Sequence, residues 1–376
     1  MRPAQLRLSL DIPMPVNDFR RGAPYNALPF LPPKTKVETV HTLKKAIGAN
    51  RALAELRGVG NQIPYQAVLI RSILLQEAKL SSEIENIVTT NDRLYRALSD
   101  EVHETDPRTK EVLRYENALW AGYQHLKNGG LLNTRHFIAL VQTIKQIEYG
   151  IRNLPGTRIV NPRTGEAVYT PPEGERVLRD LLDNLSEYIY SEDDIDPLIK
   201  LAVLHYQFEA IHPFSDGNGR TGRVLNILYL VHKQLLDIPV LYLSRYIIEN
   251  KNAYYTGLRR VTEEGAWEDW IVYMLEAIEA TAISTKERIL SIRQAFEASL
   301  EIARSGMNKG YTKELIELIY QQPYTRIAFL ESAGIAKRQT GSLYLKALEE
   351  LGLLQSVKLG REIVYLNPRL LDILSS

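Results

Sequence analysis

The sequence predicts a mainly α protein, with a helical core, one short β-hairpin and a small C-terminal domain that combines helices with a second hairpin. Three observations support this fold class. Apolar residues recur at helical spacing along most of the chain, which is the pattern of amphipathic helices. Short β-type runs occur in only two regions. Clusters of proline and glycine separate the helical segments and mark their ends.

The overall composition indicates a cytoplasmic protein without membrane spans. Its 376 residues are too many for one compact core and indicate two or three domains. A net charge of +1 provides no general attraction to nucleic acid or acidic membranes. The absence of cysteine excludes disulfides and thiolate chemistry and fits a reducing compartment. Residues 1–16 lack the apolar run of a signal peptide, and no window holds 18 apolar residues.

The first 35 residues are rich in proline and predict an extended arm. Helices are then expected at about 37–57, 64–97, 107–127, 134–147, 175–190, 195–210, 220–236, 247–263 and 267–304. Residues 157–172 contain two β-type runs around a turn from Pro162 to Gly165, and a pair of prolines ends the second run. This segment predicts the first hairpin.

A break from Ser305 to Gly310 separates the last long helix from a different pattern. Helices are expected at 313–320, 326–332 and 338–351, and strands at 355–358 and 362–366 around Gly360. Three helices and a hairpin in this order are those of a winged helix, which usually docks its third helix in the major groove of DNA.

DNA binding through this domain would use five basic residues: Lys337, Arg338, Lys346, Lys358 and Arg361. The stretch 306–376 holds nine Lys or Arg against seven Asp or Glu, so its charge is weak evidence for such a partner. A helical interaction or dimerisation module is the alternative interpretation.

The densest group of reactive side chains is residues 212–223, which read His-Pro-Phe-Ser-Asp-Gly-Asn-Gly-Arg-Thr-Gly-Arg. The three glycines allow close approach of the backbone to a ligand, and a helical pattern follows at once. Backbone N–H groups at a helix N-terminus bind anions. Arg220 and Arg223 stand three residues apart and share a helix face, so with these amides they indicate a polyphosphate ligand.

His212 and Asp216 supply the other chemistry of this stretch. Because His212 precedes Pro213, its backbone is expected to be extended and to present the imidazole at the entrance of the loop. A near-neutral pKa suits His212 to general-base catalysis. Asp216 could hold a divalent metal ion against the phosphates.

Three other kinds of site do not fit the spacing. The G-x-x-x-x-G run from Gly217 is followed by Arg-Val rather than the Lys-Ser or Lys-Thr of a P-loop, which argues against a P-loop. A calcium loop starting at Asp216 needs glutamate at its twelfth position, where Ile227 stands. His205 and His212 are seven residues apart, without an H-E-x-x-H motif or cysteine for zinc. A plain solvated turn between two buried helices stays open as the alternative.

The pattern H-P-F-x-D-G-N-G-R-x-x-R resembles the motif of Fic-domain proteins, and residues 212–223 match it at all nine defined positions. The resemblance implies an all-helical Fic core that transfers a nucleoside monophosphate, usually AMP from ATP with magnesium, to a Ser, Thr or Tyr hydroxyl. His212 would accept the proton of this hydroxyl and Asp216 would bind magnesium. ATP would be held by Gly217, Asn218, Gly219, Arg220, Thr221, Gly222 and Arg223, with Asn218 at the α-phosphate and the arginines at the β- and γ-phosphates.

A second motif lies upstream, inside the helix expected at 64–97. Ser81, Glu85 and Asn86 match the pattern Ser/Thr-x-x-x-Glu-Gly/Asn, which resembles the inhibitory motif of Fic proteins that carry their own inhibitory helix. By this resemblance Glu85 would dock on Arg223, occupy the cation that binds the γ-phosphate and prevent productive ATP binding. A solvated helix glutamate is the alternative.

Two further segments resemble the family more loosely. In Fic proteins a hairpin called the flap aligns the target peptide by strand addition, and Val168 and Tyr169 would then lie over the nucleotide. Asn250, Tyr254 and Tyr255 resemble the segment that lines the adenine side of the pocket. A plain surface hairpin is the alternative for the flap.

These observations favour an autoinhibited protein adenylyltransferase that modifies itself or a partner protein, similar to single-chain bacterial Fic proteins of the SoFic type. The expected domains are an N-terminal extension with the inhibitory helix at 1–110, a Fic core at 111–305 and a winged helix at 306–376. A DNA-binding regulator whose Fic core senses nucleotide is the alternative function. Removal of AMP by the same site, transfer of UMP or phosphocholine, and a homodimeric state also stay open.

Overall fold

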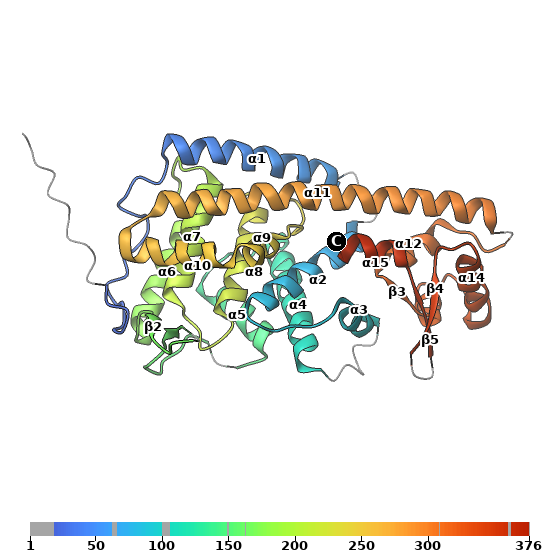
Figure 1. The fold of residues 1–376 in the computed structure, drawn as a ribbon, viewed down its shortest axis with the longest axis horizontal. Coiled ribbons are helices and arrows are strands. Elements are labelled where there is room, and N and C mark those ends of the chain that lie inside the picture. Colours follow the sequence, from blue (N-terminus) through green and yellow to red (C-terminus); the bar gives the residue numbers. More distant parts are fainter. Residues whose placement is uncertain are drawn as a thin grey trace, which may run out of the picture.

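The computed structural model describes residues 19–61, 66–99, 106–148, 150–161, 163–307, 309–359 and 362–375. Helices dominate these residues, and small antiparallel sheets complete the fold. Figure 1 shows the long helix α11 (Trp267–Gly306) running along the molecule with α1 (Val40–Asn61) beside it. The predicted mainly α fold class is confirmed.

The larger part of the molecule is a set of helices packed about one apolar core. Besides α1 and α11 it contains α2 (Gln66–Ile84), α3 (Asn91–Ser99), α4 (Pro107–Lys127), α5 (Thr134–Lys145), β1 (Ile159–Val160), β2 (Ala167–Tyr169), α6 (Glu175–Tyr190), α7 (Pro197–Ile211), α8 (Asn218–His232), α9 (Leu243–Glu249) and α10 (Lys251–Glu264). α4 and α7 begin at aspartate caps, Asp106 and Asp196, and each has proline in its first turn.

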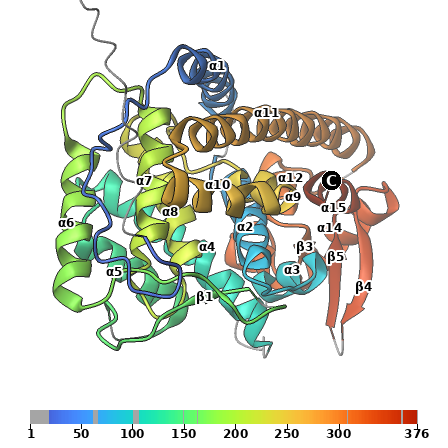
Figure 2. The same ribbon diagram turned by 60° about the vertical axis from the view of Figure 1, so that its left-hand side comes forward.

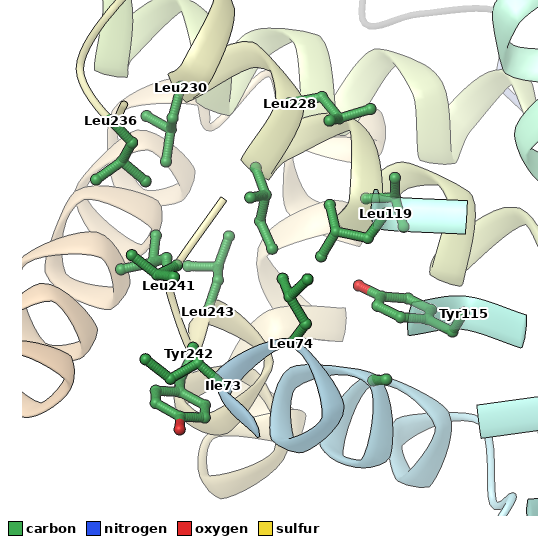
Figure 3. Packing of buried hydrophobic residues seen from close by; sticks show 14 of the residues in the cluster. Ile73, Leu74, Tyr115, Leu119, Leu228, Leu230, Leu236, Leu241, Tyr242 and Leu243 are labelled. Atoms are coloured by element: carbon green, nitrogen blue, oxygen red, sulfur yellow. The ribbon is translucent and has the colours of Figure 1, made fainter. Parts of the chain in front are cut away.

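Helix α2 lies within this core. Figure 3 shows Ile73 and Leu74 of α2 among side chains of α4, α8 and α9, including Tyr115, Leu228 and Leu243. Ile73 and Leu74 are each only 1% exposed. The helix that contains Ser81 and ends directly before Glu85 is therefore an integral part of the hydrophobic core, because burial of this apolar face stabilises its position.

The expectation of one helix at 64–97 was wrong. α2 ends at Ile84, Asn86 adopts a left-handed backbone with φ 62°, and α3 starts at Asn91. Thr90 caps α3 by accepting a hydrogen bond from the Arg93 N–H at 3.2 Å. A left-handed asparagine and a new capping threonine therefore end one helix and begin another, although the apolar spacing continues. Residues 64 and 65 lie outside the described residues.

The helix expected at 247–263 is also two helices, α9 and α10, which meet at Asn250. The Asn250 side chain donates a hydrogen bond to the Tyr246 carbonyl at 3.0 Å. Asparagine disrupts helices through such local bonds to the backbone, and the sequence pattern did not reveal this break.

The C-terminal part contains the helices and the hairpin in the predicted order. Its elements are α12 (Lys313–Gln321), β3 (Tyr324–Thr325), α13 (Ile327–Ser332), α14 (Arg338–Glu350), β4 (Gln355–Leu359), β5 (Glu362–Leu366) and α15 (Pro368–Ser375). The three strands pair antiparallel in the order β3-β5-β4. The sequence analysis missed β3, which has two residues, and α15. Gly360 and Arg361 lie outside the described residues.

The N-terminal arm packs against the first hairpin. From residue 19 to α1 the chain forms no helix or strand, and the Tyr25 N–H donates to the Thr170 carbonyl at 3.1 Å. In the hairpin β1 and β2 pair antiparallel, with Ile159 opposite Tyr169. The segment expected to form a hairpin does so. Residues 1–18 and Pro162 of the turn lie outside the described residues.

Replacement of Trp270 tests the packing of α11 on the core. Trp270 is 0% exposed, and its indole N–H donates to the Ala202 carbonyl at 2.8 Å. We expect Trp270→Ala to lower the free energy of unfolding by about 3–5 kcal/mol, because a cavity remains and the hydrogen bond of the indole is lost. Trp120→Ala, at a site 37% exposed, is the matched control and should cost about 1 kcal/mol or less. If urea unfolding showed that the two variants lose the same free energy of unfolding, this packing of α11 would be contradicted.

Candidate active site

The loop between α7 and α8 carries the predicted catalytic motif. α7 ends at Ile211, and His212 caps it in a left-handed conformation with φ 45° and ψ 57°. The expectation of an extended His212 was wrong, because the end of the helix imposes a left-handed cap that outweighs the preference set by Pro213. Gly217, with φ 83°, opens α8 without a side-chain cap, so no capping side chain takes the first N–H groups of this helix.

Two side chains hold this loop in shape. Asn218 accepts a hydrogen bond from the Phe214 N–H at 2.8 Å and donates one to the Phe214 carbonyl at 2.7 Å. Arg152 donates to the His212 carbonyl at 2.8 Å and to the Pro172 carbonyl at 2.5 Å. The amide of Asn218, predicted to bind the α-phosphate, thus braces the loop in this structure. Sequence reasoning missed Arg152, because its local sequence has no feature that links it to a loop 60 residues away.

His212 is a partly buried base. Burial lowers its pKa to about 4, and Arg152 adds to this effect. The imidazole is therefore neutral at pH 7 and can accept a proton. Its Nδ1 atom has no hydrogen-bond partner among the described residues.

Arg220 and Asp216 belong to a cluster of four charges. Glu111 of α4 accepts hydrogen bonds from Arg220 and from Lys145, both at 2.5 Å. Asp216 lies 2.7 Å from Lys145 and 3.6 Å from Arg220, and its side chain is 63% exposed. Partial burial opposes ionisation of Asp216, but Lys145 outweighs it and holds the pKa of this carboxyl below its ordinary value. The sequence motif did not reveal Glu111 and Lys145, which come from distant helices.

Arg223, which is only 1% exposed, binds Ser81 and Glu85. Its Nε donates to Ser81 Oγ at 2.8 Å, and its Nη2 donates to the Ser81 carbonyl at 2.9 Å and to Glu85 Oε1 at 2.8 Å. Burial opposes ionisation of Glu85, but Arg223 outweighs it and holds the pKa of this carboxyl below its ordinary value. The fold therefore brings the two motifs together across 138 residues of sequence.

The end of α2 positions Glu85 for this contact. The left-handed Asn86 turns the chain directly after Glu85, and Lys251 of α10 donates to the Ile84 carbonyl at 2.5 Å. A Cβ atom at Gly219 would overlap both the Glu85 carboxylate and the Arg223 guanidinium. Glycine at 219 therefore permits the close approach of the segment that carries Glu85 to the start of α8.

Two further acids, buried Glu77 and partly buried Glu209, lie near Arg223. Glu77, eight residues before Glu85, accepts hydrogen bonds from the Ser244 N–H at 3.0 Å and from the Ser244 hydroxyl at 2.5 Å. Burial raises the pKa of Glu77 to about 7, although the hydrogen bonds from Ser244 favour the ionised form. Burial likewise raises the pKa of Glu209 to about 7, and a Cβ atom at Gly222 would overlap its carboxylate. Neither acid belongs to a recognised motif, so the sequence analysis missed both.

The predicted flap residues lie close to the end of α7. Tyr169 donates a hydrogen bond to the Ala210 carbonyl at 2.7 Å, and its ring stacks on Phe19 with centroids 5.7 Å apart. Val168 is partly exposed. Tyr169 therefore ties the hairpin to the helix that ends at His212.

The predicted adenine-side residues fall into different environments. Tyr254 is 2% exposed, and its hydroxyl lies 2.9 Å from His205 Nε2. Tyr255 is 46% exposed beside it, with ring centroids 5.2 Å apart. The Asn250 side chain donates its hydrogen bond to the Tyr246 carbonyl of α9. Thr221, within α8, donates to the Gly217 carbonyl at 2.9 Å. Of this set, Tyr255 presents its ring to solvent.

One cavity lies away from this loop. It holds about 490 Å³ between α9, α11 and α15, and Arg245, Tyr246, Arg288 and Ile373 are among its lining residues. Within the described part of the chain, no group of three or more His, Asp or Glu side chains could hold a metal ion. None of the described helices is long and apolar enough to cross a membrane.

Three family models match successive parts of the chain. The Fic/DOC family N-terminal model matches residues 43–124, the Fic/DOC family model matches 131–230, and the model of the SoFic-like protein adenylyltransferase C-terminal domain matches 296–370. Together with the complete motif at 212–223, these matches show that the chain contains domains of the Fic/DOC family. Its C-terminal part resembles the SoFic-like branch of that family.

Similar curated proteins include a probable protein adenylyltransferase of Aquifex aeolicus, 30% identical over 196 residues, which are 51% of this chain and 55% of that protein. Protein adenylyltransferase fic-1 of Caenorhabditis elegans is 31% identical over 115 residues, which are 30% of this chain and 21% of that protein. The chain thus spans about half of the first relative and about a fifth of the second.

Two solved structures support the fold. A Fic family protein from Desulfovibrio desulfuricans has a TM-score of 0.53 at 18% identity, covering 90% of this chain and 98% of its own. Fic-1 of C. elegans (residues 134–508) has a TM-score of 0.50 at 21% identity, covering 67% and 74%. The predicted domain limits of 1–110, 111–305 and 306–376 stay a prediction.

A proton NMR titration of the imidazole C–H signals tests the environment of His212. We expect one signal that is absent from His212→Ala and titrates near pH 4, because burial and Arg152 both disfavour the protonated form. His41, an exposed histidine at the molecular surface, provides the internal reference signal. A midpoint near the ordinary value of 6.5 for His212 would contradict this desolvated environment of the imidazole.

Proposed function

We propose that the chain is a protein adenylyltransferase that transfers AMP from ATP to a Ser, Thr or Tyr hydroxyl of itself or of a partner protein. The hydroxyl oxygen forms a bond to the α-phosphorus, the bond from this phosphorus to the bridging oxygen breaks, and pyrophosphate leaves. The hydroxyl proton passes to the imidazole of His212. The names of the curated relatives support this activity.

The neutral imidazole at the end of α7 supports the role of His212 as the proton acceptor. A general base of this kind typically contributes about 10²–10⁴-fold in rate. The adjacent hairpin supports a role in presenting the target, because Tyr169 ties it to the end of α7. The target hydroxyl would then approach beside His212.

The N-terminus of α8 is the proposed phosphate site. Backbone N–H groups at this end, the guanidinium of Arg220 and the ammonium of Lys145 provide positive charge where the triphosphate would lie. Positioning and charge neutralisation are the main requirements of nucleotidyl transfer, as for phosphoryl transfer. Lys145 thereby joins the proposed ATP-binding residues.

Asp216 fits the proposed magnesium site. Its carboxylate is ionised, largely exposed and placed at the end of the phosphate-binding loop. Magnesium in such sites takes one or two carboxylates together with substrate phosphates and water, so a closed cage of protein ligands is not required. The bound ion would offset phosphate charge.

The observation that most supports the proposed function is the ion pair of Glu85 and Arg223. Arg223 is the cation proposed for the γ-phosphate, and Glu85 and Ser81 occupy its Nε and Nη2 donors. A triphosphate therefore has to displace Glu85 to reach this guanidinium. We propose that the protein is autoinhibited by this contact. Removal of AMP with Glu85 as the group that positions water is an alternative use of the same residue.

Replacement of Glu85 tests both the activity and its restraint. Incubated with magnesium and ATP labelled at the α-phosphate, Glu85→Gly should label protein about 10-fold faster than the wild type, because Arg223 becomes available. Glu83→Gly is the matched control, since it removes the same charge from the same turn and is not among the groups that bind Arg223.

Glu85→Gly/His212→Ala should lose the label gained in the single variant. Equal rates in Glu85→Gly and Glu83→Gly, with folding confirmed by circular dichroism, would contradict the restraint. Label that persists in the double variant would contradict the role of His212.

DNA binding is a second candidate function, which the surface of α14 favours. Lys337, Arg338, Gln339 and Thr340 are exposed at its start, and Lys346 is exposed further along. No acidic residue occurs from residue 333 to 348. Basic and amide side chains at the start of a recognition helix are the groups that read base edges and bind phosphates.

Charge reversal tests this second function. If α14 binds duplex DNA, the Lys337→Glu/Arg338→Glu variant should weaken binding about 10-fold or more at 0.1 M salt, because phosphate contacts dominate affinity. Arg176→Glu/Arg179→Glu on α6, where the two side chains are 95% and 49% exposed, is the control with the same change of net charge. Fluorescence anisotropy with a labelled duplex measures both, and equal affinities for the two variants would contradict DNA binding by α14.

A further inference from the structure

The C-terminal part packs directly against the segment that ends at Glu85. α12 and α15 contact α2, and β3 contacts α3. Figure 2 shows α2 and α3 between the core helices and this C-terminal part, with α12, α15 and β3 beside them. Helix α2 thus has the core on one side and the C-terminal elements on another.

Hydrogen bonds reinforce this contact at α3. The hydroxyl of Tyr324 on β3 donates to Asp92 of α3, and Tyr324 is only 3% exposed. Asn91 of α3 donates to the hydroxyl of Ser375 on α15 at 3.0 Å. Both bonds join residues more than 230 positions apart in the sequence.

The same segment is tied internally from α3 back to α2. Gln76 of α2, which is 4% exposed, donates to the Tyr95 hydroxyl at 2.6 Å and to Asn91 at 3.4 Å. One residue further, Glu77 binds Ser244 of α9. α3 and the C-terminal part therefore hold one side of α2, and the core holds the side that leads to Ser81 and Glu85.

The ion pair of Glu85 and Arg223 is insufficient by itself to fix this arrangement. The Glu85 side chain is 35% exposed, so solvent screens part of its attraction to Arg223. Glu85 directly follows the end of α2, and Ser81 within α2 also binds Arg223, so displacement of Glu85 in the wild type involves movement of this end of the helix. What fixes α2 therefore determines how often Arg223 is available.

We propose that the C-terminal elements α12, β3 and α15 act as a clamp on α2 and α3 that keeps Glu85 on Arg223. This inference rests on the proposed function and extends it to its regulation. A change that loosens the contact between β3 and α3 raises the fraction of molecules in which Arg223 is free. The C-terminal domain is then a regulatory input to nucleotidyl transfer, whatever partner it binds.

The test uses Tyr324→Phe in the full-length chain, with transfer of α-labelled AMP as the readout. This variant keeps the buried ring and removes the hydroxyl that binds Asp92. Tyr320→Phe is the matched control, because Tyr320 is also 3% exposed but its hydroxyl lies 2.8 Å from Ser299 of α11. Tyr324→Phe should raise transfer several-fold over the wild type and over Tyr320→Phe.

Both variants are also made in the Glu85→Gly background, where the restraint is already absent. There Tyr324→Phe should leave the rate unchanged. If Glu85→Gly is active and Tyr324→Phe alone does not exceed Tyr320→Phe, the clamp is wrong while the proposed function stands. If Glu85→Gly itself transfers no label, the proposed function fails first.

Hydrogen exchange provides a readout that does not depend on activity. Amides in the last two turns of α2 should exchange faster in Tyr324→Phe than in Tyr320→Phe, because the helix opens more often. Unchanged protection of these amides would overturn the clamp, and it would do so even if both variants proved inactive.

Discussion

The buried guanidinium of Arg223 is the charge on which the rest of the site depends. An unpaired cation that is 1% exposed would be costly, so the fold must supply acceptors for it. It supplies them from α2 and the residue that follows, and α2 is itself embedded in the core by Ile73 and Leu74. The position of α2 and the state of Arg223 are therefore physically coupled, which is the basis for the proposed control of ATP binding.

The acids around Arg223 have unequal roles because their environments differ. Glu77 is buried and Glu209 is partly buried, and desolvation raises the pKa of each to about 7, so neither is fully ionised at neutral pH. Glu85 is more exposed and stays ionised beside Arg223. Glu85 is consequently the main counter-charge, and also the most easily displaced of the three because it lies at the end of a helix. This combination suits a contact that a phosphate can replace.

The sequence predicted the mainly α fold, most helices and the motif loop, because each depends on local spacing. It could not predict Arg152, Glu111 or Lys145, which reach the loop from distant elements and have no motif of their own. The left-handed turn at Asn86 and the break at Asn250 were also missed, since the apolar pattern continues through both. His212 shows the limit of a local rule, because the end of α7 sets its backbone despite Pro213. Ser81, Glu85 and Arg223 meet in the structure, while their roles and those of the other site residues stay predictions.

The most direct test of the account is the contribution of the γ-phosphate to binding, measured by calorimetry with ATP and with ADP in the presence of magnesium. In the wild type, where Glu85 occupies Arg223, the two nucleotides should bind with similar affinity. In Glu85→Gly we predict that ATP binds about 10-fold more tightly than ADP, because Arg223 can then bind the γ-phosphate. An equal preference for ATP in both proteins would contradict the claim that Glu85 controls this cation.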